Sequence, residues 1–485
     1  MAGTFVERGL RFVRTIILAK LLLPEDLGIV ALVTAAMLVF EAVNEVGVRQ
    51  SVIQHKKGDQ EEYLNVAWWF QSVRTILFLS VAYLVAPLIS RFYAEPQMLN
   101  LLRVMLLSIL FKGLMSPRAF VLEKHLRFAK AVLLVQGSGL LGTVVTVVLV
   151  FMLRSVWAII IGFAIESFIQ CALSYFLCPF RPRLQIDRIY LREILRFARG
   201  MLGLPILTLI AFQTDVVVLG KVVSKELVGM YFMAFQLARM PRELYARIVG
   251  KLLLPVFSKK QDDNRMLCRA VLKMARGTSA IFTPLTAFLI VCAGALLSIA
   301  YTPEYAEVSV PFCLLCMVVL LRTQGLILVS TYLAIGQPQL HRSFVALRAA
   351  ILVLLLYPGI VFGRLVGAAS VVLFAESVAF VAQVHWMRKR VGLKVGDYFS
   401  CFLPGLWASL IVVIPVGAAV IMGVESMWML LVIGAGCCLA ACTTSVLLLA
   451  ARPAESQIQR TTFSSPAQPP ETVEDNSFIR TGANT

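Results

Sequence analysis

The chain has 485 residues, of which 59% are hydrophobic and only 15% are charged, and its formal net charge is +18. A soluble globular domain carries about 25% charged residues, so this composition excludes that class. Apolar runs recur at about the 20 residues that a membrane-spanning helix needs, whereas a transmembrane β-barrel would show alternating segments of about 10 residues. The sequence therefore predicts an all-α polytopic membrane protein.

Fourteen membrane spans are predicted from the apolar runs. They cover residues 4–23, 28–53, 64–90, 98–117, 131–153, 156–179, 200–222, 227–257, 277–299, 308–335, 343–363, 367–387, 399–422 and 427–450. We expect a six-helix lobe over 1–195, a second six-helix lobe over 196–395, an additional helix pair over 396–450 and a cytoplasmic tail over 451–485. The tail is rich in Ser, Pro, Gln, Thr and Glu, a composition typical of disordered segments.

A short pattern occurs in both halves of the chain. After the first predicted span the sequence reads LAKLLLPEDLG, and the second half contains VLGKVVSKELVG. Aligning Lys20 with Lys221 gives an offset of 201 residues, which also pairs Gly28 with Gly229. Such a match at corresponding points of two halves of a membrane protein predicts a duplicated helical bundle.

Basic residues in the connecting loops indicate the orientation. With the amino terminus in the cytoplasm, the inner loops hold 24 Lys and Arg residues and the outer loops only 4. Because basic loops are retained on the cytoplasmic side, both termini are predicted to lie there. The net charge then reflects topology, and no nucleic-acid partner is expected. Ten cysteines, almost all in apolar segments, and four scattered histidines predict neither a metal site nor a cofactor.

Four predicted spans, 4–23, 28–53, 200–222 and 227–257, contain two or more ionisable residues each. This is unusual, because each such residue costs about 2.5–3.5 kcal/mol to place within a bilayer. These four helices hold ten cations against five acids. One interpretation is interhelical ion pairing, with Arg14 opposite Glu41 and Arg11 opposite Glu45. The other is a cationic cavity that takes an anionic guest, since arginine stays charged when desolvated and binds phosphate through two hydrogen bonds. Between two helical bundles, a lipid with a phosphate or diphosphate head group suits such a cavity.

The turn LAKLLLPEDLGIVAL and the following FEAVNEVGVRQSVIQ resemble the opening of polysaccharide exporters and lipid-linked oligosaccharide flippases. In the second half, FQTDVVVLGKVVSKELVGMYFMAFQLARMPRELY and LLLPVFSK resemble their seventh and eighth helices. The chain departs from the family at Asn44-Glu45-Val46, where an aspartate more often precedes a leucine-glycine pair. On these stretches the chain is identified as a member of the multidrug/oligosaccharidyl-lipid/polysaccharide exporter superfamily.

The resemblance implies two six-helix lobes around a V-shaped cavity lined by helices 1, 2, 7 and 8. It further implies alternating access that moves an undecaprenyl-diphosphate oligosaccharide across the bacterial inner membrane for exopolysaccharide, capsule or O-antigen synthesis. Asp215 is expected to be the ion-coupling residue, and a hydrogen-bonded structural role is its alternative. Together with the charges, the resemblance implies substrate binding by Arg8, Arg11, Arg14, Glu41, Arg49, Arg239, Arg242 and Arg247.

Two other functions compete with this one. A drug or cation antiporter would share the fold, but an arginine-rich cavity repels a cationic substrate. A membrane-embedded glycosyltransferase or polymerase could use the acidic pair Glu25-Asp26, but the predicted outer loops are only a few residues long. We therefore expect a transporter and not an enzyme. It should act as a monomer in the bilayer, with a lipid-linked oligosaccharide as substrate and the polysaccharide polymerase and export machinery as partners.

Overall fold

The computed structural model describes residues 2–44, 47–125, 127–184, 187–201, 203–422, 424 and 426–450. In this part of the chain every regular element is a helix and there is no strand. The predicted tail over 451–485 and Glu45 lie outside the described residues.

The helices are α1 (Ala2–Leu21), α2 (Pro24–Asn44), α3 (Val48–Gln54), α4 (Glu61–Phe92), α5 (Pro96–Gly113), α6 (Arg118–Lys124), α7 (Phe128–Val132), the π-helix η1 (Leu133–Gly137), α8 (Ser138–Leu153), α9 (Val156–Leu177), α10 (Arg188–Met201), α11 (Gly203–Val222), α12 (Lys225–Ile248), α13 (Gly250–Ser258), α14 (Asn264–Val291), α15 (Ala293–Ala300), the 3-10 helix η2 (Pro303–Val308), α16 (Ser309–Ala334), α17 (Pro338–Val391), α18 (Val395–Ser400), α19 (Leu403–Ile421) and α20 (Met427–Ala450).

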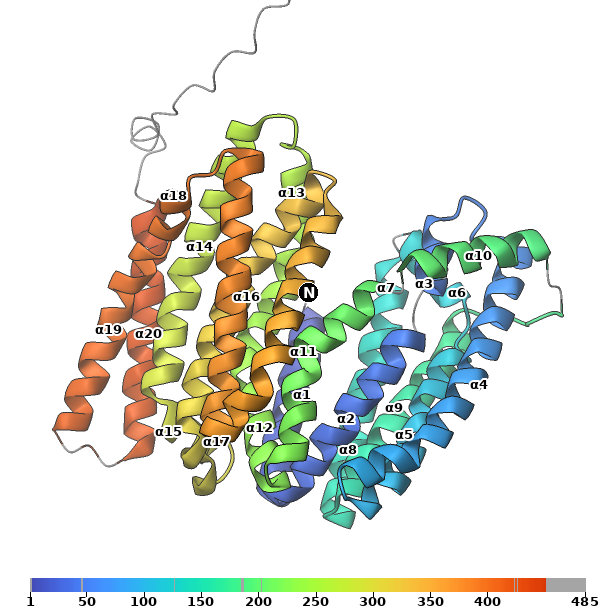
Figure 1. Ribbon diagram of the computed structural model, residues 1–485, viewed down its shortest axis with the longest axis horizontal. Coiled ribbons are helices and arrows are strands. Elements are labelled where there is room, and N and C mark those ends of the chain that lie inside the picture. The colour runs from blue at the N-terminus through green and yellow to red at the C-terminus, as the bar shows by residue number, and fades with distance from the viewer. Residues whose placement is uncertain are drawn as a thin grey trace, which may run out of the picture.

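The helices form two groups that α10 connects (Figure 1). We call α1–α9 the first lobe and α11–α20 the second lobe. The lobes meet where α2 packs against α11 and α12, and where α1 touches α12. They approach each other at the end that carries the first turns of α2 and α12, here the converging end, and separate toward α10 and α13, the diverging end (Figure 1). The predicted boundary between residues 195 and 196 falls inside α10, and the division into domains remains a prediction.

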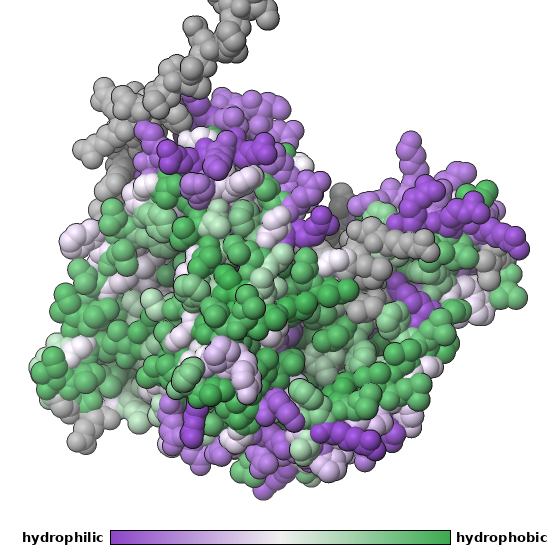
Figure 2. All heavy atoms as spheres, in the orientation of Figure 1, coloured by the Kyte–Doolittle hydropathy of each residue, from purple (hydrophilic) through white to green (hydrophobic). Residues whose placement is uncertain are grey.

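The chain is a multi-pass membrane protein. Among the described residues, nine helices are long and apolar enough to cross a bilayer, or ten if a bent pair counts as one span. This criterion passes over α1 and α12, which carry several charged residues, and it counts α17 once although α17 bends at Arg364. The number of fourteen spans therefore remains a prediction. Figure 2 shows apolar side chains over the middle of both lobes and polar ones gathered at both the diverging and the converging ends.

The two turns at the converging end use similar sequence signals. Pro24 opens α2 with Glu25 and Asp26 in its first turn, and Ser224 caps α12 with Glu226 in its first turn. Proline fits the first helical position, and acidic side chains favour the positive end of the helix dipole. The acidic residues of the repeated pattern are thus helix starts.

Two glycines from the repeat face each other at this end. A Cβ atom at Gly28 would lie 1.9 Å from the carbonyl oxygen of Lys225, and a Cβ atom at Gly229 would lie 1.9 Å from that of Pro24. Lys225 follows Pro24 by 201 residues, the same interval that separates the two glycines. The contact is therefore reciprocal, as expected where corresponding parts of two repeats pack across a pseudo-twofold axis. Only glycine allows α2 and α12 to cross this closely.

Candidate substrate-binding site

Arginines recur at every third residue along α1, so they share one broad side of the helix. The Nη2 atom of Arg11 lies 2.5 Å from Oε1 of Glu166 on α9, and its Nε atom lies 2.6 Å from Oε1 of Glu7. The adjacent α8 leaves room for this guanidinium, because a Cβ atom at Gly139 would lie 2.7 Å from Arg11 Nη2. Arg11 is therefore paired twice within the first lobe.

Two ion pairs join α1 to α12 and so connect the lobes. The Nη1 atom of Arg8 lies 2.7 Å from Oε2 of Glu243, and Nη1 of Arg247 lies 3.9 Å from Oε2 of Glu7. Glu243 is shared, because Nε of Arg239 lies 3.1 Å from its Oε1. Glu243 therefore pairs both with an arginine of its own helix and with an arginine of α1 in the other lobe.

The remaining two arginines are less well paired. Arg14 lies 4.0 Å from Glu166, between Nη1 and Oε2, and its guanidinium carbon lies 5.4 Å from the ring centre of Phe163. Arg242 has no carboxylate within ion-pair distance among the described residues. Among the arginines of α1 and α12, the Nε atoms of Arg8, Arg14, Arg239 and Arg242 are buried without a hydrogen-bond partner in the described part of the chain.

A small cavity of about 110 Å³ opens beside the α12 arginines. Its walls are formed by Phe212, Phe235, Arg239, Arg242, Glu243, Val319 and Arg322. One water needs about 10–15 Å³ by the same kind of measure, so the space suits several waters or one phosphoryl group. The lining of the cavity thus combines two aromatic rings with three guanidinium groups and one carboxylate.

These groups form one cluster with an excess of positive charge. We define the interlobe cluster as Glu7, Arg8, Arg11, Arg14, Glu166, Arg239, Arg242, Glu243 and Arg247. It contains six guanidinium groups and three carboxylates. Because buried charges are normally paired, three extra cations with unsatisfied donors favour an anionic ligand.

A second set of charges lies inside the second lobe and is balanced. Nε of Arg322 on α16 and Nη1 of Arg348 on α17 each lie 2.8 Å from Oε2 of Glu376. Asp215 on α11 is buried and accepts hydrogen bonds from the Tyr231 hydroxyl at 3.3 Å and from a backbone N–H. We call Asp215, Arg322, Arg348 and Glu376 the second-lobe quartet. Its two cations and two acids need no further ligand.

Two predicted site residues lie outside the interlobe cluster. Glu41 accepts a 2.7 Å hydrogen bond from Nζ of Lys112 on α5, and Arg49 on α3 pairs with Glu123 at 2.7 Å near the surface. The expected pairing of Arg14 with Glu41 is wrong, because α1 packs against α8 and α12 while α5 packs on α2. The expected pairing of Arg11 with Glu45 involves a residue outside the described part of the chain.

Sequence reasoning missed the partners that complete both sets. Glu166, Arg322 and Glu376 each stand alone in an apolar span, so no spacing relates them to other charges. Arg348 falls within the predicted span over 343–363, near its cytoplasmic end, and in the structure it is buried and donates from Nη2 to the Ala211 carbonyl at 2.6 Å. An isolated charge in an apolar helix does indicate from sequence that the residue has a buried partner. It does not indicate which residue that partner is.

A family model described as polysaccharide biosynthesis protein matches residues 17–310. The chain belongs to this family. The match covers α12 and its arginines and begins after Arg8, Arg11 and Arg14. The expected kinship with polysaccharide biosynthesis proteins is thereby confirmed.

Two curated relatives are similar to this chain over part or most of its length. The succinoglycan biosynthesis transport protein ExoT of Rhizobium meliloti is 24% identical over 283 residues, which cover 58% of this chain and 56% of that protein. The lipopolysaccharide biosynthesis protein WzxC of Escherichia coli is 22% identical over 410 residues, covering 84% of this chain and 82% of that protein. The chain thus spans about half the length of the first relative and most of the second.

Solved structures establish the fold. The lipid II flippase MurJ in an inward closed conformation superposes with a TM-score of 0.76 at 14% identity, covering 93% of this chain and 99% of MurJ. A multidrug resistance MATE family transporter of the MOP superfamily, in an inward-facing conformation, gives a TM-score of 0.64 at 15% identity and covers 80% of this chain and 94% of that chain. The predicted all-α polytopic fold is confirmed.

Proposed function

We propose that the protein is a flippase that moves an undecaprenyl-diphosphate-linked oligosaccharide across the bacterial inner membrane during synthesis of a surface polysaccharide. The excess of three cations in the interlobe cluster is the observation that carries this proposal. The names of the family and of its succinoglycan and lipopolysaccharide relatives agree with it. Exopolysaccharide, capsule and O-antigen are the candidate products.

Head group and tail of such a lipid require different surroundings. A diphosphate is stabilised by guanidinium groups, which bind its oxygens bidentately and keep their charge when desolvated. The cluster lies between α1 and α12, one helix from each lobe, so the head group would sit between the lobes while the tail stays in the bilayer. Binding at this junction would couple occupancy to rocking of the lobes.

The proposed diphosphate ligands are Arg8, Arg11, Arg14, Arg239, Arg242 and Arg247. Arg242 and Arg14 should contribute most, because they have the weakest ion pairing within the protein. Glu41 and Arg49 are engaged elsewhere, and we leave them out of the proposed ligand set.

We place both termini and the diverging end in the cytoplasm, following the excess of basic loop residues there. The converging end would then face the periplasm, and the lobes would be open toward the cytoplasm. No catalytic step is proposed, since Glu25 and Asp26 are accounted for as the first turn of α2. A polysaccharide polymerase and the export machinery are the expected partners, and the two-lobe design would work as a monomer.

Asp215 is our candidate for ion coupling. Its carboxylate is buried on α11, next to the helices that line the junction, and its electrostatic neighbours include Arg322 and Arg348. A proton or cation arriving at Asp215 would change the balance of the second-lobe quartet. Neutralising Asp215 would thus change the electrostatic interactions that hold α11, α16 and α17 together in the second lobe.

The test measures flipping of a lipid diphosphate-linked oligosaccharide in proteoliposomes, with Arg14→Ala, Arg239→Ala and Arg247→Ala beside wild type. We expect the folded variants to lose at least tenfold in rate, and Arg269→Ala, an exposed residue of α14, to match wild type. Normal rates in all three variants would make these arginines structural. A wild type that flips no lipid-linked sugar but exports a cationic dye would be the drug antiporter instead.

A further inference from the structure

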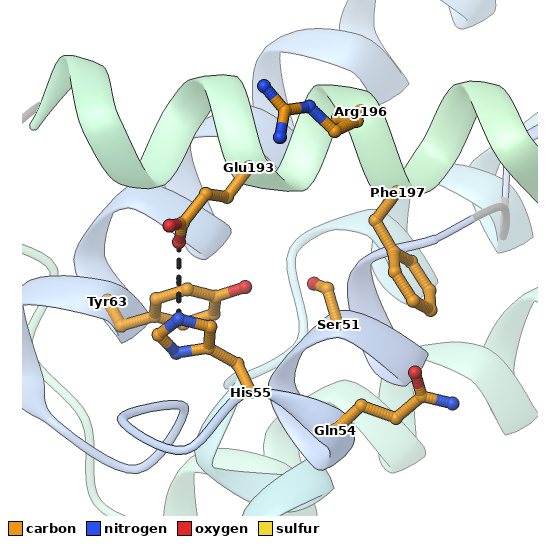
Figure 3. Close-up of a pocket in the computed structure, with 7 residues that line it drawn as sticks. All are labelled: Ser51, Gln54, His55, Tyr63, Glu193, Arg196 and Phe197. Carbon is orange, nitrogen blue, oxygen red and sulfur yellow. Dashed lines mark ion pairs between the residues drawn. The ribbon is translucent and has the colours of Figure 1, made fainter. Parts of the chain in front are cut away.

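A second and larger cavity lies at the diverging end of the first lobe. Its volume is about 610 Å³, within the range of roughly 300–1,000 Å³ that is usual for small-molecule sites. Figure 3 shows the groove between α3 and α10, with Phe197 and Glu193 projecting from α10 toward α3. It is lined by Ser51, Gln54, His55, Tyr63, Glu193, Arg196 and Phe197.

The floor of this groove is held in place by aromatic stacking. The His55 ring lies parallel to the Tyr63 ring at a centroid distance of 4.5 Å, and Tyr190 meets both rings edge-on. Nε2 of His55 lies 3.2 Å from Oε2 of Glu193, which fixes the imidazole from the α10 side. His55, Tyr63 and Glu193 are thus positioned by one another before any ligand arrives.

The backbone around His55 is also fixed. Nζ of Lys124 donates to the carbonyl oxygens of His55 and Lys56 at 2.9 and 3.2 Å, and to Oδ1 of Asp59 at 3.2 Å. This hydrogen bond keeps the pKa of the Asp59 carboxyl below its usual range. On the other side, a Cβ atom at Gly47 would lie 2.8 Å from Cα of Ala198, so α10 sits directly on the start of α3. A groove built this way is preorganised, which lowers the cost of binding.

The chemistry of the lining favours a neutral ligand rich in hydroxyl groups. Gln54 and Arg196 are exposed and make no hydrogen bond to another described residue, so their amide and guanidinium donors face solvent. Glu193 and Arg196 balance each other in charge, unlike the cationic interlobe cluster. A flat apolar ring, that of Phe197, projects from α10 toward Ser51 and Gln54 (Figure 3). Aromatic faces next to planar hydrogen-bonding groups suit a sugar, which has apolar ring faces and a polar edge.

The position of the groove relates it to the transport path. Its wall α3 follows α2 after only a few residues, and α10 leads into α11, so both walls adjoin helices at the junction of the lobes. We propose that this groove binds sugar residues at the glycan end of the lipid-linked oligosaccharide, as a subsite separate from the diphosphate site. The inference rests on the proposed function for the identity of the ligand. It assigns recognition of the sugar to the linker between the lobes.

The test separates sugar binding from head-group binding in full-length protein held in nanodiscs. One probe is the free oligosaccharide released by mild acid from the host's own lipid-linked pool, and the other is undecaprenyl diphosphate without sugar. Affinity for each is measured by calorimetry for wild type, Phe197→Ala and Glu193→Gln. The controls are Phe362→Ala and Gln60→Ala, exposed residues outside the groove.

We expect both groove variants to bind the free oligosaccharide at least tenfold more weakly and undecaprenyl diphosphate as wild type does. Glu193→Gln keeps the shape of an exposed side chain, and we expect this variant to fold. Its sugar affinity therefore tests the inference even if Phe197→Ala fails to fold. A wild type that flips the intact lipid but binds no free oligosaccharide, or groove variants with unchanged sugar affinity, would overturn this inference and leave the proposed function intact. Displacement of the sugar by phosphatidylglycerol head groups would also overturn it, by assigning the groove to a phospholipid. Absence of flipping in wild type would overturn the proposed function itself.

Discussion

Nζ of Lys225 lies 2.5 Å from Oε2 of Glu95, and this ion pair ties the start of α12 in the second lobe to the loop between α4 and α5 in the first. Beside it, Nζ of Lys221 donates to the carbonyl of Phe92 at 2.6 Å, and the Tyr93 hydroxyl donates to the carbonyl of Val217 at 3.2 Å. Polar contacts between the two lobes therefore close the converging end, next to the reciprocal crossing of Gly28 and Gly229. Alternating access requires these contacts to break.

Reversing one charge of this pair should open the converging end. An ion pair that solvent still reaches contributes about 1 kcal/mol, and 1 kcal/mol changes a two-state ratio about fivefold. We expect Lys225→Glu to shift the population toward wider distances between spin labels at Gln97→Cys and Glu226→Cys, in a background without the native cysteines. Adding Glu95→Lys should restore the wild-type distribution. The control Arg91→Glu reverses an exposed charge at the same end and should change nothing. An unaltered distribution in Lys225→Glu would show that the pair does not hold the lobes together.

The glycine crossing should not tolerate even one methyl group. Gly28→Ala places a Cβ atom about 1.9 Å from a carbonyl oxygen, so α2 and α12 have to move apart. Overpacking of this kind costs typically about 1–3 kcal/mol. We expect a lower unfolding temperature, wider label distances and slower flipping. Gly277→Ala on α14 is the matched control, because nothing lies within 4 Å of its added atom. Equal stability of the two variants would contradict the close crossing.

Removing Arg242 should affect transport more than stability. This guanidinium lines the 110 Å³ cavity, and among the described residues no carboxylate lies within ion-pair distance, so its loss leaves no acid unpaired. We expect Arg242→Ala to flip at least tenfold more slowly while unfolding at the wild-type temperature. Arg242→Lys should recover part of the rate, since lysine keeps the charge without the bidentate geometry. A normal rate in Arg242→Ala would remove this residue from the proposed ligand set.

In the second-lobe quartet, by contrast, removing a charge should affect stability more than transport. Glu376 is the shared acid of Arg322 and Arg348, and all three side chains are less than 10% exposed. Breaking a buried ion pair from one side costs about 3–5 kcal/mol, because the remaining charge stays buried without compensation. We expect Glu376→Gln to be strongly destabilised in a thermal unfolding assay, with Glu304→Gln, at an exposed position of η2, as the control. A stable Glu376→Gln protein would mean that water reaches the quartet.

Replacing Asp215 tests ion coupling. Asp215→Asn removes the charge and retains the size, so the hydrogen bond from Tyr231 has an acceptor in both proteins. We expect flipping to lose its dependence on an imposed proton or sodium gradient and to keep its dependence on the substrate gradient. The measurement compares rates with and without each gradient in proteoliposomes. If the variant responds to the gradients as wild type does, Asp215 is a structural residue.

The sequence by itself determined that this is a helical membrane protein built from two related halves. Composition and apolar run length settle the class, because a bilayer leaves few ways to satisfy backbone hydrogen bonds. The 201-residue interval paired Gly28 with Gly229 as corresponding positions of the two halves, and the structure then brings these two positions together at the converging end. Charge spacing on α1 and α12 likewise selected arginines that the structure brings together.

Only the tertiary structure decided which charges are paired. Helical spacing says which residues share a face of one helix, but Glu166, Lys112 and Glu376 come from other helices whose order around the bundle leaves no trace in local sequence. Long-range packing also gave Arg348 a buried partner, Glu376, which its place in the predicted span over 343–363 did not indicate. The groove between α3 and α10 was not predicted for the same reason, because its walls lie more than a hundred residues apart in the chain and meet only after the first lobe has folded.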